Sequence, residues 1–354
     1  MGALAEFASP LFTERLPMTR NRSSRRAARL AAAAVLTSAV AMAHADDNVQ
    51  FLLDWIPSGE FAAYYAGLSQ GFFKEQGIDL KISRGFGGGD TVNKVGAGSA
   101  QFGIADIAPV FAARAKTGLP VKVISSMYVY SPHSMFVLES SGITSLADLK
   151  GKNVGITPGN SHKFYFPEVA KRVGLDESTV RWTNVDASTM ASLLIAKKLD
   201  AAPFFAIHEY YINKSAQAQG EKIRVLPYVE TGFTIYSSSI LTSDNTLESN
   251  PDLVKRFLAA IWKSQQWAHA HPEEACKLHV AQNPEVKADD CLGSFKAEDK
   301  YVFDDFAAKT GFGKFDDRRL ADTWAQVTKA QQLDPQWDYQ QAVDTALVPA
   351  AAAK

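Results

Sequence analysis

Beyond residue 45, the chain alternates short apolar runs with longer amphipathic stretches. Apolar runs bounded by Gly, Pro or Asp are typical of buried strands, whereas apolar residues three or four positions apart are typical of helices. Strands that alternate with short helices predict an α/β fold with parallel pairing and right-handed crossovers. The predicted strands cover residues 49–54, 78–83, 102–104, 121–125, 133–138, 180–185, 200–205 and 233–243. The segment 145–156 predicts a helix followed by a further strand.

The amphipathic stretches predict helices between these strands. One helix spans residues 62–76 and ends at Gly77, which suits a left-handed C-terminal cap. Beyond Asn250-Pro251 the pattern is helical to the end of the chain. Further predicted helices fall within residues 157–175, 189–198, 253–269 and 320–331.

The strand pattern restarts near Ser131-Pro132, which predicts two α/β lobes. Two passages, near residues 128–136 and 232–241, would carry the chain between the lobes and form a hinge with a cleft beside it. Ligands of open α/β sheets bind outside the carboxyl ends of the strands, so we expect the cleft there. The predicted division is 46–130 for the first part of lobe 1, 131–235 for lobe 2, and 236–354 for the completion of lobe 1 and the C-terminal helices.

The first 45 residues have the pattern of a secretory signal peptide. A cluster of arginines precedes an apolar run at residues 30–42, and Ala43-His44-Ala45 is a small-residue cleavage pattern. A membrane anchor is the alternative, but this run is shorter than the roughly 20 residues that span a bilayer. We expect cleavage after Ala45 and a periplasmic location, with residues 1–17 an extension upstream of a start at Met18.

Composition narrows the class of protein. Hydrophobic residues make up 46% of the chain and charged residues 21%, and the formal net charge is −1. These values are typical of a globular protein and give no indication of a nucleic-acid partner. We expect a monomer.

The chain has two cysteines, Cys276 and Cys291, in a polar helical region. In an oxidising compartment an isolated pair usually forms a disulfide. The alternative is a pair of metal ligands, for which the neighbouring sequence lacks further Cys and has only scattered His. His269 and His271 could form another metal pair, but helical spacing points them apart. We predict a disulfide and no metal site.

Several segments resemble the NMT1/THI5-like family of periplasmic binding proteins, which includes receptors for sulfonates and for thiamine-pyrimidine precursors. The opening motif "DWIPSGEFAAYYAGLSQGFFKEQGIDLKI" has the Asp-Trp pair, the following Pro and the helix end of that family. The similarity continues through "GSAQFGIAD", "AKTGLPVKVI", "GITSLADLKGKNVGI" and "NPDLVKRFLAAIWKSQQWAHAHPEEA", and covers nearly all of residues 49–275.

The resemblance implies a type II periplasmic-binding-protein fold and a solute receptor, without a cofactor, that serves the permease and ATPase of an ABC importer. The same superfamily contains an enzyme that builds the thiamine pyrimidine from its own histidine and pyridoxal phosphate. That enzyme has a cysteine-rich run in the return strand and a Lys and a His near the "GIAD" motif. Here Ala105 and Pro109 stand at those two positions and neither stretch contains Cys, so a non-enzymatic receptor is the prediction.

The loop after the first predicted strand is rich in aromatic and polar groups. We expect Trp55, Glu60, Phe61 and Tyr64 to contact a ligand at the rim of the cleft. Stacked or edge-on rings hold a flat solute well. Tyr65 neighbours Tyr64 on the predicted helix, and two neighbours cannot share one helix face, so at least one of them belongs to the core.

The other candidate ligand contacts lie at turns that follow predicted strands. At several of them capping of the next helix is the alternative role. The aromatic far wall favours a small heteroaromatic ligand, with a thiamine-related pyrimidine first; a sulfonate or nitrate held at helix N-termini is the alternative. The candidates are Gly88, Gly89, Asp90, Thr91 and Asp106 in lobe 1, Asn160, Ser161, His162, Asp186, Phe204, His208 and Glu209 in lobe 2, and Tyr236 near the hinge.

Overall fold

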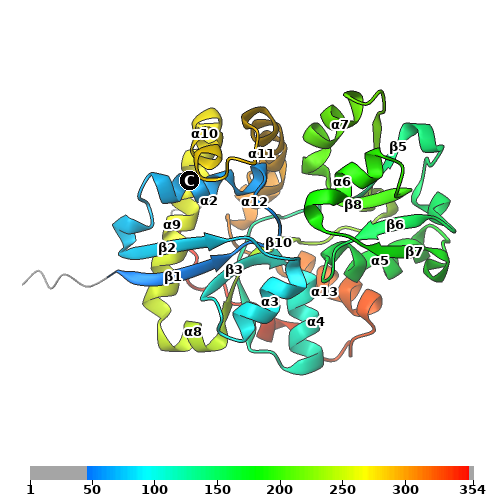
Figure 1. Cartoon of the computed structure of the whole chain (residues 1–354). Coiled ribbons are helices and arrows are strands. Elements are labelled where there is room, and N and C mark those ends of the chain that lie inside the picture. Colours follow the sequence, from blue (N-terminus) through cyan, green and yellow to red (C-terminus); the bar gives the residue numbers. More distant parts are fainter. Residues whose placement is uncertain (1–45, 351–354) are drawn as a thin grey trace, which may run out of the picture. The chain divides into compact units, whose positions relative to one another are not determined.

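The computed structural model describes residues 46–350 and contains two five-stranded sheets, each flanked by helices (Figure 1). The predicted signal peptide and its cleavage position lie outside the described residues. The predicted α/β class is confirmed.

The first sheet has the strand order β2-β1-β3-β10-β4. β1 pairs in parallel with both β2 and β3, and β10 runs antiparallel between β3 and β4. The carboxyl ends of β1 to β4 and the amino end of β10 therefore lie at one edge. The strands are β1 (Asp47–Leu52), β2 (Ile78–Ser83), β3 (Phe102–Asp106), β4 (Val121–Ser126) and β10 (Ser238–Ser243).

The second sheet has the order β7-β6-β8-β5-β9. β6 pairs in parallel with β7 and β8, whereas β5 is antiparallel to both of its neighbours. The strands are β5 (His133–Leu138), β6 (Asn153–Ile156), β7 (Arg181–Asn184), β8 (Ala201–Phe205) and β9 (Ile223–Pro227).

The chain passes from the first sheet to the second between β4 and β5, and returns between β9 and β10. Each crossing delivers the chain to the edge where the other strands of the new sheet end, so β5 and β10 must run antiparallel to them. The expectation of parallel pairing throughout is wrong for these two strands. The predicted strand 233–243 is also too long, because β10 begins only at Ser238.

Helices cover both faces of the first sheet (Figure 1). α2 (Ala62–Ser69) and α9 (Pro251–Ala270) pack together on one face, where the rings of Phe102 and Phe257 stack with centroids 3.8 Å apart. α3 (Gly88–Gly96) and α4 (Ile107–Thr117) lie on the other face. Burial of these apolar side chains supplies most of the stabilisation of such a layered structure.

The helix predicted for residues 62–76 is shorter in the structure. Gly71 adopts φ of 79°, which only glycine adopts readily, and the chain continues into a short 3₁₀ helix, Lys74–Gln76. That helix ends at Gly77 with φ of 65°, which confirms the predicted left-handed cap.

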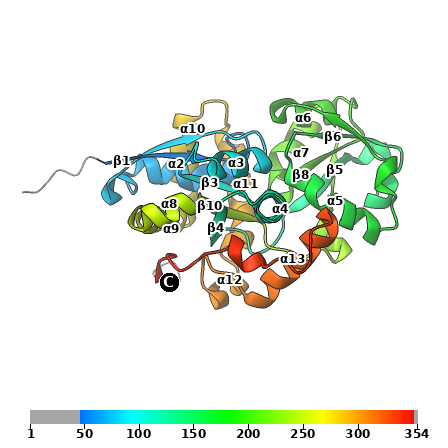
Figure 2. The same cartoon turned by 90° about the horizontal axis from the view of Figure 1, so that it is seen from below.

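The remaining helices surround the second sheet or add to those around the first. Each sheet with its surrounding helices is called a half of the molecule below. α13 packs against α4 and α5, so it contacts helices that flank both sheets (Figure 2). Cys276 of α10 and Cys291 of α11 form the predicted disulfide. These helices are α5 (Ser161–Arg172), α6 (Ala187–Ile195), α7 (Glu209–Gln217), α8 (Asp244–Ser249), α10 (Pro272–Gln282), α11 (Ala288–Val302), α12 (Asp305–Thr310) and α13 (Asp317–Gln331).

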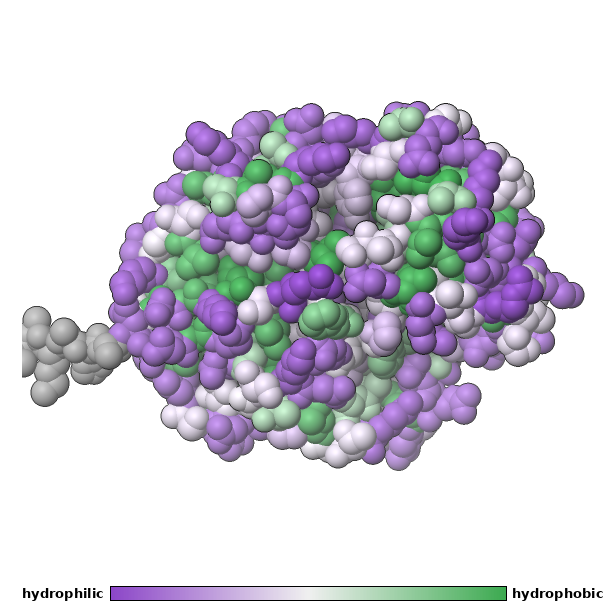
Figure 3. Space-filling view, viewed as in Figure 1, coloured by the Kyte–Doolittle hydropathy of each residue, from purple (hydrophilic) through white to green (hydrophobic). Residues whose placement is uncertain are grey.

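Hydrophilic residues are spread widely over the face of the molecule drawn in Figure 3, with smaller hydrophobic patches between them. Within residues 46–350, none of the helices combines the length and the apolar character needed to cross a membrane.

Candidate functional site

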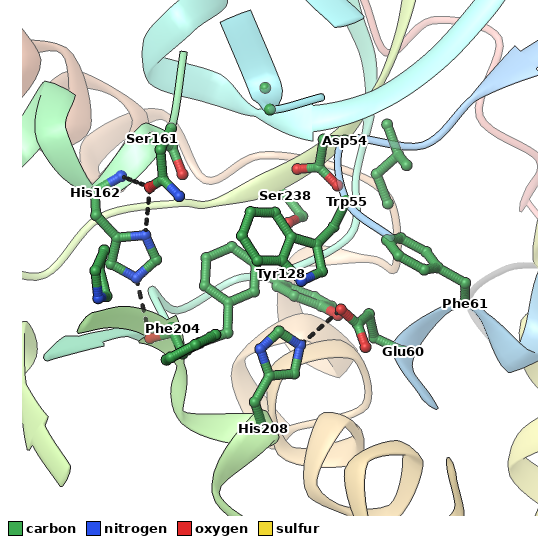
Figure 4. Close-up of a pocket in the computed structure, with 16 residues that line it drawn as sticks. Asp54, Trp55, Glu60, Phe61, Tyr128, Ser161, His162, Phe204, His208 and Ser238 are labelled. Carbon is green, nitrogen blue, oxygen red and sulfur yellow. Dashed lines mark hydrogen bonds and ion pairs between the residues drawn. The ribbon is translucent and has the colours of Figure 1, made fainter. Parts of the chain in front are cut away.

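A cavity lies where the strand ends of the two sheets face each other (Figure 4). We call it the inner cavity; its empty volume is about 510 Å³. The position agrees with the rule that ligands of open α/β sheets bind beyond the carboxyl ends of the strands. The lining residues are Asp54, Trp55, Glu60, Phe61, Gly87, Gly88, Ile104, Tyr128 and Ser238 from the first sheet and its connections, and Asn160, Ser161, His162, Pro203, Phe204, Phe205 and His208 from the second.

Aromatic rings from both halves form the walls of the inner cavity. Trp55 follows β1 and packs partly against the apolar clusters of both halves. Tyr128, after β4, meets Phe205 of β8 edge to face, with ring centroids 6.2 Å apart. The indole Nε1 of Trp55 is buried without a hydrogen-bond partner among the described residues, so it is free to donate to a ligand.

Glu60 and His208 join the two halves across the inner cavity. Oε1 of Glu60 lies 2.8 Å from Nε2 of His208, and both side chains are buried. Glu60 belongs to a 3₁₀ helix after β1, Gly59–Phe61, and His208 to one after β8, Ala206–His208. Burial pushes the pKa of Glu60 upward, but the attraction and hydrogen bond of His208 outweigh it and lower the pKa.

Glu60 and His208 each have a second polar side-chain atom outside this contact. Oε2 of Glu60 and Nδ1 of His208 are buried without hydrogen-bond partners among the described residues. Buried polar atoms are normally paired, so these two atoms favour a polar ligand at this point.

Asp54 adds a second carboxyl group to the inner cavity. Its backbone carbonyl accepts a hydrogen bond from the N–H of Gly87, which fixes the turn after β1. Burial, with the negative charge of Glu60, raises the pKa of the Asp54 carboxyl to about 8. A neutral carboxyl at this position can both donate and accept a hydrogen bond.

The amino end of α5 supplies the opposite wall. Asn160 is the N-cap, and its Oδ1 accepts from the backbone N–H of His162 at 2.9 Å. Nε2 of His162 donates to the backbone carbonyl of Phe204 at 3.0 Å. Burial lowers the pKa of His162 to about 3, so the ring is neutral.

A buried polar cluster lies behind Ser161 and also spans the two halves. Oγ of Ser161 is 2.9 Å from Nε2 of His133, and Oδ2 of Asp106 is 3.6 Å from the same nitrogen. Tyr165 and Ser237 donate hydrogen bonds to Asp106. Oγ of Ser131 is 2.7 Å from Nδ1 of the His133 ring, so a serine and an acid lie on opposite ring nitrogens, as in a Ser–His–Asp catalytic relay. The 3.6 Å between Asp106 and His133 exceeds hydrogen-bond distance, however, and Ser131 is buried and is not among the residues that line the inner cavity.

Nine of the predicted site residues line the inner cavity together. Their predicted role as ligand contacts stays a prediction. They are Trp55, Glu60, Phe61, Gly88, Asn160, Ser161, His162, Phe204 and His208.

Four other predicted residues are buried outside the inner cavity, where packing or capping accounts for them. Tyr64 packs edge-on against Phe51 in the core, with centroids 5.3 Å apart. Oγ1 of Thr91 donates to the carbonyl of Leu53. Asp106 caps α4 through the N–H of Ala108. Tyr236 accepts a hydrogen bond from the N–H of Asp316 on its hydroxyl.

The remaining four predicted residues lie nearer the surface. Asp90 pairs with Lys94 at 2.7 Å, and Asp186 caps α6. Glu209 is exposed at the start of α7. The N–H of Gly89 donates to the carbonyl of Gly159 in the other half at 3.1 Å, so Gly89 takes part in the contact between the halves.

Seven lining residues were absent from the predicted set. Asp54 and Tyr128 lie two residues beyond β1 and β4, Gly87 lies four residues beyond β2, and Ser238 is the first residue of β10, so applying the strand-end rule to every strand would have found them. Ile104 lies within β3 and Pro203 within β8, where no local pattern distinguishes them from core residues. Phe205 is the last residue of β8 and belongs with Phe204 and His208 to the aromatic far wall that the sequence predicts. The seven are Asp54, Gly87, Ile104, Tyr128, Pro203, Phe205 and Ser238.

The polar lining of the inner cavity is distinctive. Two carboxyl groups line it, and neither Lys nor Arg is among its lining residues within the described part of the chain. Nor do residues 46–350 contain a group of three or more His, Cys, Asp or Glu side chains placed to hold a metal ion.

Two mixed α/β sheets with a cavity between their strand ends define the type II periplasmic-binding-protein fold. The alkanesulfonate-binding protein SsuA from Xanthomonas axonopodis pv. citri, solved with MOPS bound, superposes with a TM-score of 0.67 at 14% identity and covers 85% of this chain and 99% of that chain. The predicted fold is confirmed.

Sequence comparison gives the family. The NMT1/THI5 like family profile matches residues 58–275, and the chain belongs to that family, as the resemblance predicted. The 4-amino-5-hydroxymethyl-2-methylpyrimidine phosphate synthase THI11 of Saccharomyces cerevisiae is 27% identical over 76% of this chain and 83% of its own length. The riboflavin-binding protein RibY of Chloroflexus aurantiacus is 25% identical over 85% of this chain and 86% of its own length.

Proposed function

We propose that the protein is the extracytoplasmic solute receptor of an ABC importer and that it captures a small aromatic or heteroaromatic solute. The observation that carries the proposal is the inner cavity between the two halves, with aromatic walls, two carboxyl groups and no lining Lys or Arg among the described residues. Such a cavity favours a flat, neutral or cationic compound over a strong anion.

A pyrimidine related to thiamine synthesis is the leading ligand. An aminopyrimidine offers a ring face for stacking and an amino donor beside a ring-nitrogen acceptor. Oε2 of Glu60 can accept from the amino group, while Nε1 of Trp55 can donate to a ring nitrogen. The named relatives that act on a pyrimidine or bind riboflavin both handle flat heteroaromatic compounds, which agrees with this choice.

Capture would proceed by closure of the two lobes about the crossings between β4 and β5 and between β9 and β10. A ligand that touches both lobes favours the closed form through its additional contacts there. A micromolar Kd corresponds to about 8 kcal/mol, which a few ring contacts and hydrogen bonds in a dewatered cavity can supply. The closed receptor, acting as a monomer, would then deliver the solute to the permease and ATPase.

Export to the periplasm is part of the same proposal. The intact mass of the protein purified from the periplasm should correspond to a chain that begins at Asp46. Retention of the first 45 residues would contradict it.

An oxyanion ligand is the second candidate within the receptor class. Gly88 and Ser161 stand at the amino ends of α3 and α5, where free N–H groups favour an anion. The structural similarity to a protein solved with a sulfonate buffer supports this candidate. The carboxyl groups of Asp54 and Glu60 oppose it.

A pyrimidine-forming enzyme is the candidate from another class, because some relatives carry that name. The two positions expected to hold its Lys and His are Ala105 and Pro109, which lie beside Gly88. Both cysteines are engaged in the disulfide. Pyridoxal-phosphate absorbance and iron-dependent turnover of the purified protein would favour the enzyme.

A thermal-shift screen tests the ligand class. The mature protein, residues 46–354, would be unfolded and refolded to remove bound solute, and then mixed with hydroxymethylpyrimidines, other flat heterocycles, sulfonates and nitrate. Stabilisation by ring compounds is the expected result. Stabilisation by sulfonates or nitrate alone would overturn the ligand assignment while leaving the receptor class in place.

A further inference from the structure

A second hollow lies beside the inner cavity, between the turn after β2 and the turns after β6 and β7. We call it the outer groove; its empty volume is about 790 Å³. Trp55 lines both hollows, so a single indole side chain lies at the boundary between them. Phe86 is 56% exposed, and Pro158 and Asp186 on the facing turns are also exposed, so the outer groove reaches the surface.

Arg84 is the positively charged side chain that lines the outer groove. It is the first residue after β2, and its guanidinium carbon lies 4.7 Å from the centroid of the Phe86 ring. Its Nε is buried without a hydrogen-bond partner, and Arg84 takes part in none of the ion pairs formed by the described residues. A buried N–H donor is normally paired, so an acceptor is missing at this position.

The neighbouring charges leave Arg84 available to a ligand. Lys94, which also lies near the Phe86 ring, is bound to Asp90 at 2.7 Å. Asp186 across the groove uses its carboxylate to accept from the N–H and hydroxyl of Ser188. It therefore acts on Arg84 from a distance and does not form an ion pair with it.

The polar groups of the site thus differ between the inside and the outside. Carboxyl groups line the inner cavity, whereas a guanidinium group lines the outer groove. A ligand that fits both has a ring with hydrogen-bond donors at one end and a negative group at the other. Arg is suited to this role because its fork of N–H donors matches carboxylate and phosphate oxygens.

We propose that the outer groove is a subsite for an anionic substituent of the ring ligand, a phosphate or a carboxylate, and that Arg84 binds it. This inference rests on the proposed function, because the ring must occupy the inner cavity for its substituent to pass Trp55 into the outer groove. The ligand class is thereby narrowed to heteroaromatic compounds that carry an acidic tail.

Matched pairs of compounds test the subsite. Kd would be measured by calorimetry on refolded mature protein for 4-amino-5-hydroxymethyl-2-methylpyrimidine and its phosphate, and for riboflavin and its 5′-phosphate. Within the pair that binds, we expect the phosphorylated member to bind at least about tenfold more tightly at low salt, and the difference to shrink at high salt. Arg84→Gln should remove the preference and leave the affinity of the unphosphorylated ring within about twofold.

Two further variants make the test specific. Arg84→Lys retains the positive charge but lacks the forked N–H donors of a guanidinium group, so it should retain part of the preference for the phosphorylated compound. Arg181→Gln removes an exposed arginine that lines neither hollow and should change nothing. Equal affinity within each pair, or a preference that survives Arg84→Gln, would overturn the subsite while the proposed function stands. If no ring compound binds in either form, the proposed function fails and the subsite fails with it.

Discussion

Nε2 of His208 lies 2.8 Å from Oε1 of Glu60, although the two residues follow strands of different sheets. Both side chains are buried, with 3% and 4% of their surface exposed. Removing one partner of such a buried pair destabilises a structure, because it leaves a buried polar or charged group unpaired. The pair therefore holds the segment after β1 against the segment after β8.

Replacing one member of this pair should be worse than replacing both. His208→Gln leaves Glu60 buried without its partner, and we expect the free energy of unfolding of the mature protein to fall by about 3 kcal/mol. The double variant Glu60→Gln/His208→Gln removes the unpaired charge and should regain part of that loss. Urea unfolding at neutral pH measures both. A double variant that is as unstable as His208→Gln, or less stable, would contradict this account.

Acid should weaken the same contact. The pKa of Glu60 is lowered below its ordinary value of 4.5, because His208 outweighs the effect of burial. A carboxyl group with a depressed pKa stabilises the folded state above its unfolded pKa, and this contribution is lost as pH falls through the lowered value. The Tm of the wild type should therefore fall more steeply below about pH 4.5 than the Tm of Glu60→Gln. Parallel curves for the two proteins would show that Glu60 contributes nothing.

Much of the fold follows from local pattern. The predicted helices 253–269 and 320–331 correspond to α9 and α13, because their apolar residues recur at helical spacing and polar caps precede them. The prediction of parallel pairing was wrong for β5. The direction of this strand depends on where the chain enters the second sheet, and no local pattern reveals that. The disulfide was predictable because the chain offers no other partner for either cysteine.

The candidate site was predictable only in part, for a geometric reason. Residues just beyond strands, such as Trp55 and Ser161, reach the inner cavity because strand ends gather at one edge. Tyr64 and Thr91 follow strands too, but helical rotation turns them into the core. Sequence reveals which turns face the cleft, whereas the direction of each side chain depends on packing.

Trp55 should act as a ring-stacking residue. Loss of a stacked ring costs about 0.5–1.5 kcal/mol beyond lost buried area, so Trp55→Ala should weaken binding of the identified ring ligand by about tenfold. Trp55→Phe retains a ring and should lose much less. Calorimetric Kd values for the three proteins decide the matter. An affinity of Trp55→Ala within about twofold of the wild type would remove Trp55 from the site.

Breaking the disulfide should destabilise the C-terminal helices. Cys276 and Cys291 are 15 residues apart, and a loop of about this length contributes roughly 3 kcal/mol by restricting the unfolded chain. We expect Cys276→Ser/Cys291→Ser to lose about this amount in urea unfolding, and dithiothreitol to produce a similar loss in the wild type only.

Asp54 should make stability depend on pH between the ordinary pKa of its carboxyl, 3.8, and about 8. Burial raises the pKa of its carboxyl from 3.8 to about 8, so the folded state holds a proton that the unfolded state releases at lower pH. A group with a raised pKa stabilises the folded state most below its unfolded pKa, and this contribution is lost as pH rises towards about 8. Between about pH 5 and pH 9, the Tm of Asp54→Asn should therefore fall less than that of the wild type, because an amide does not ionise.

Asp90→Asn is the matched control, since Asp90 is paired with Lys94 at the surface, and it should follow the wild type. If the Asp54→Asn and wild-type curves fall in parallel, Asp54 is already ionised in the folded protein, and its carboxylate would meet the ligand as an acceptor only.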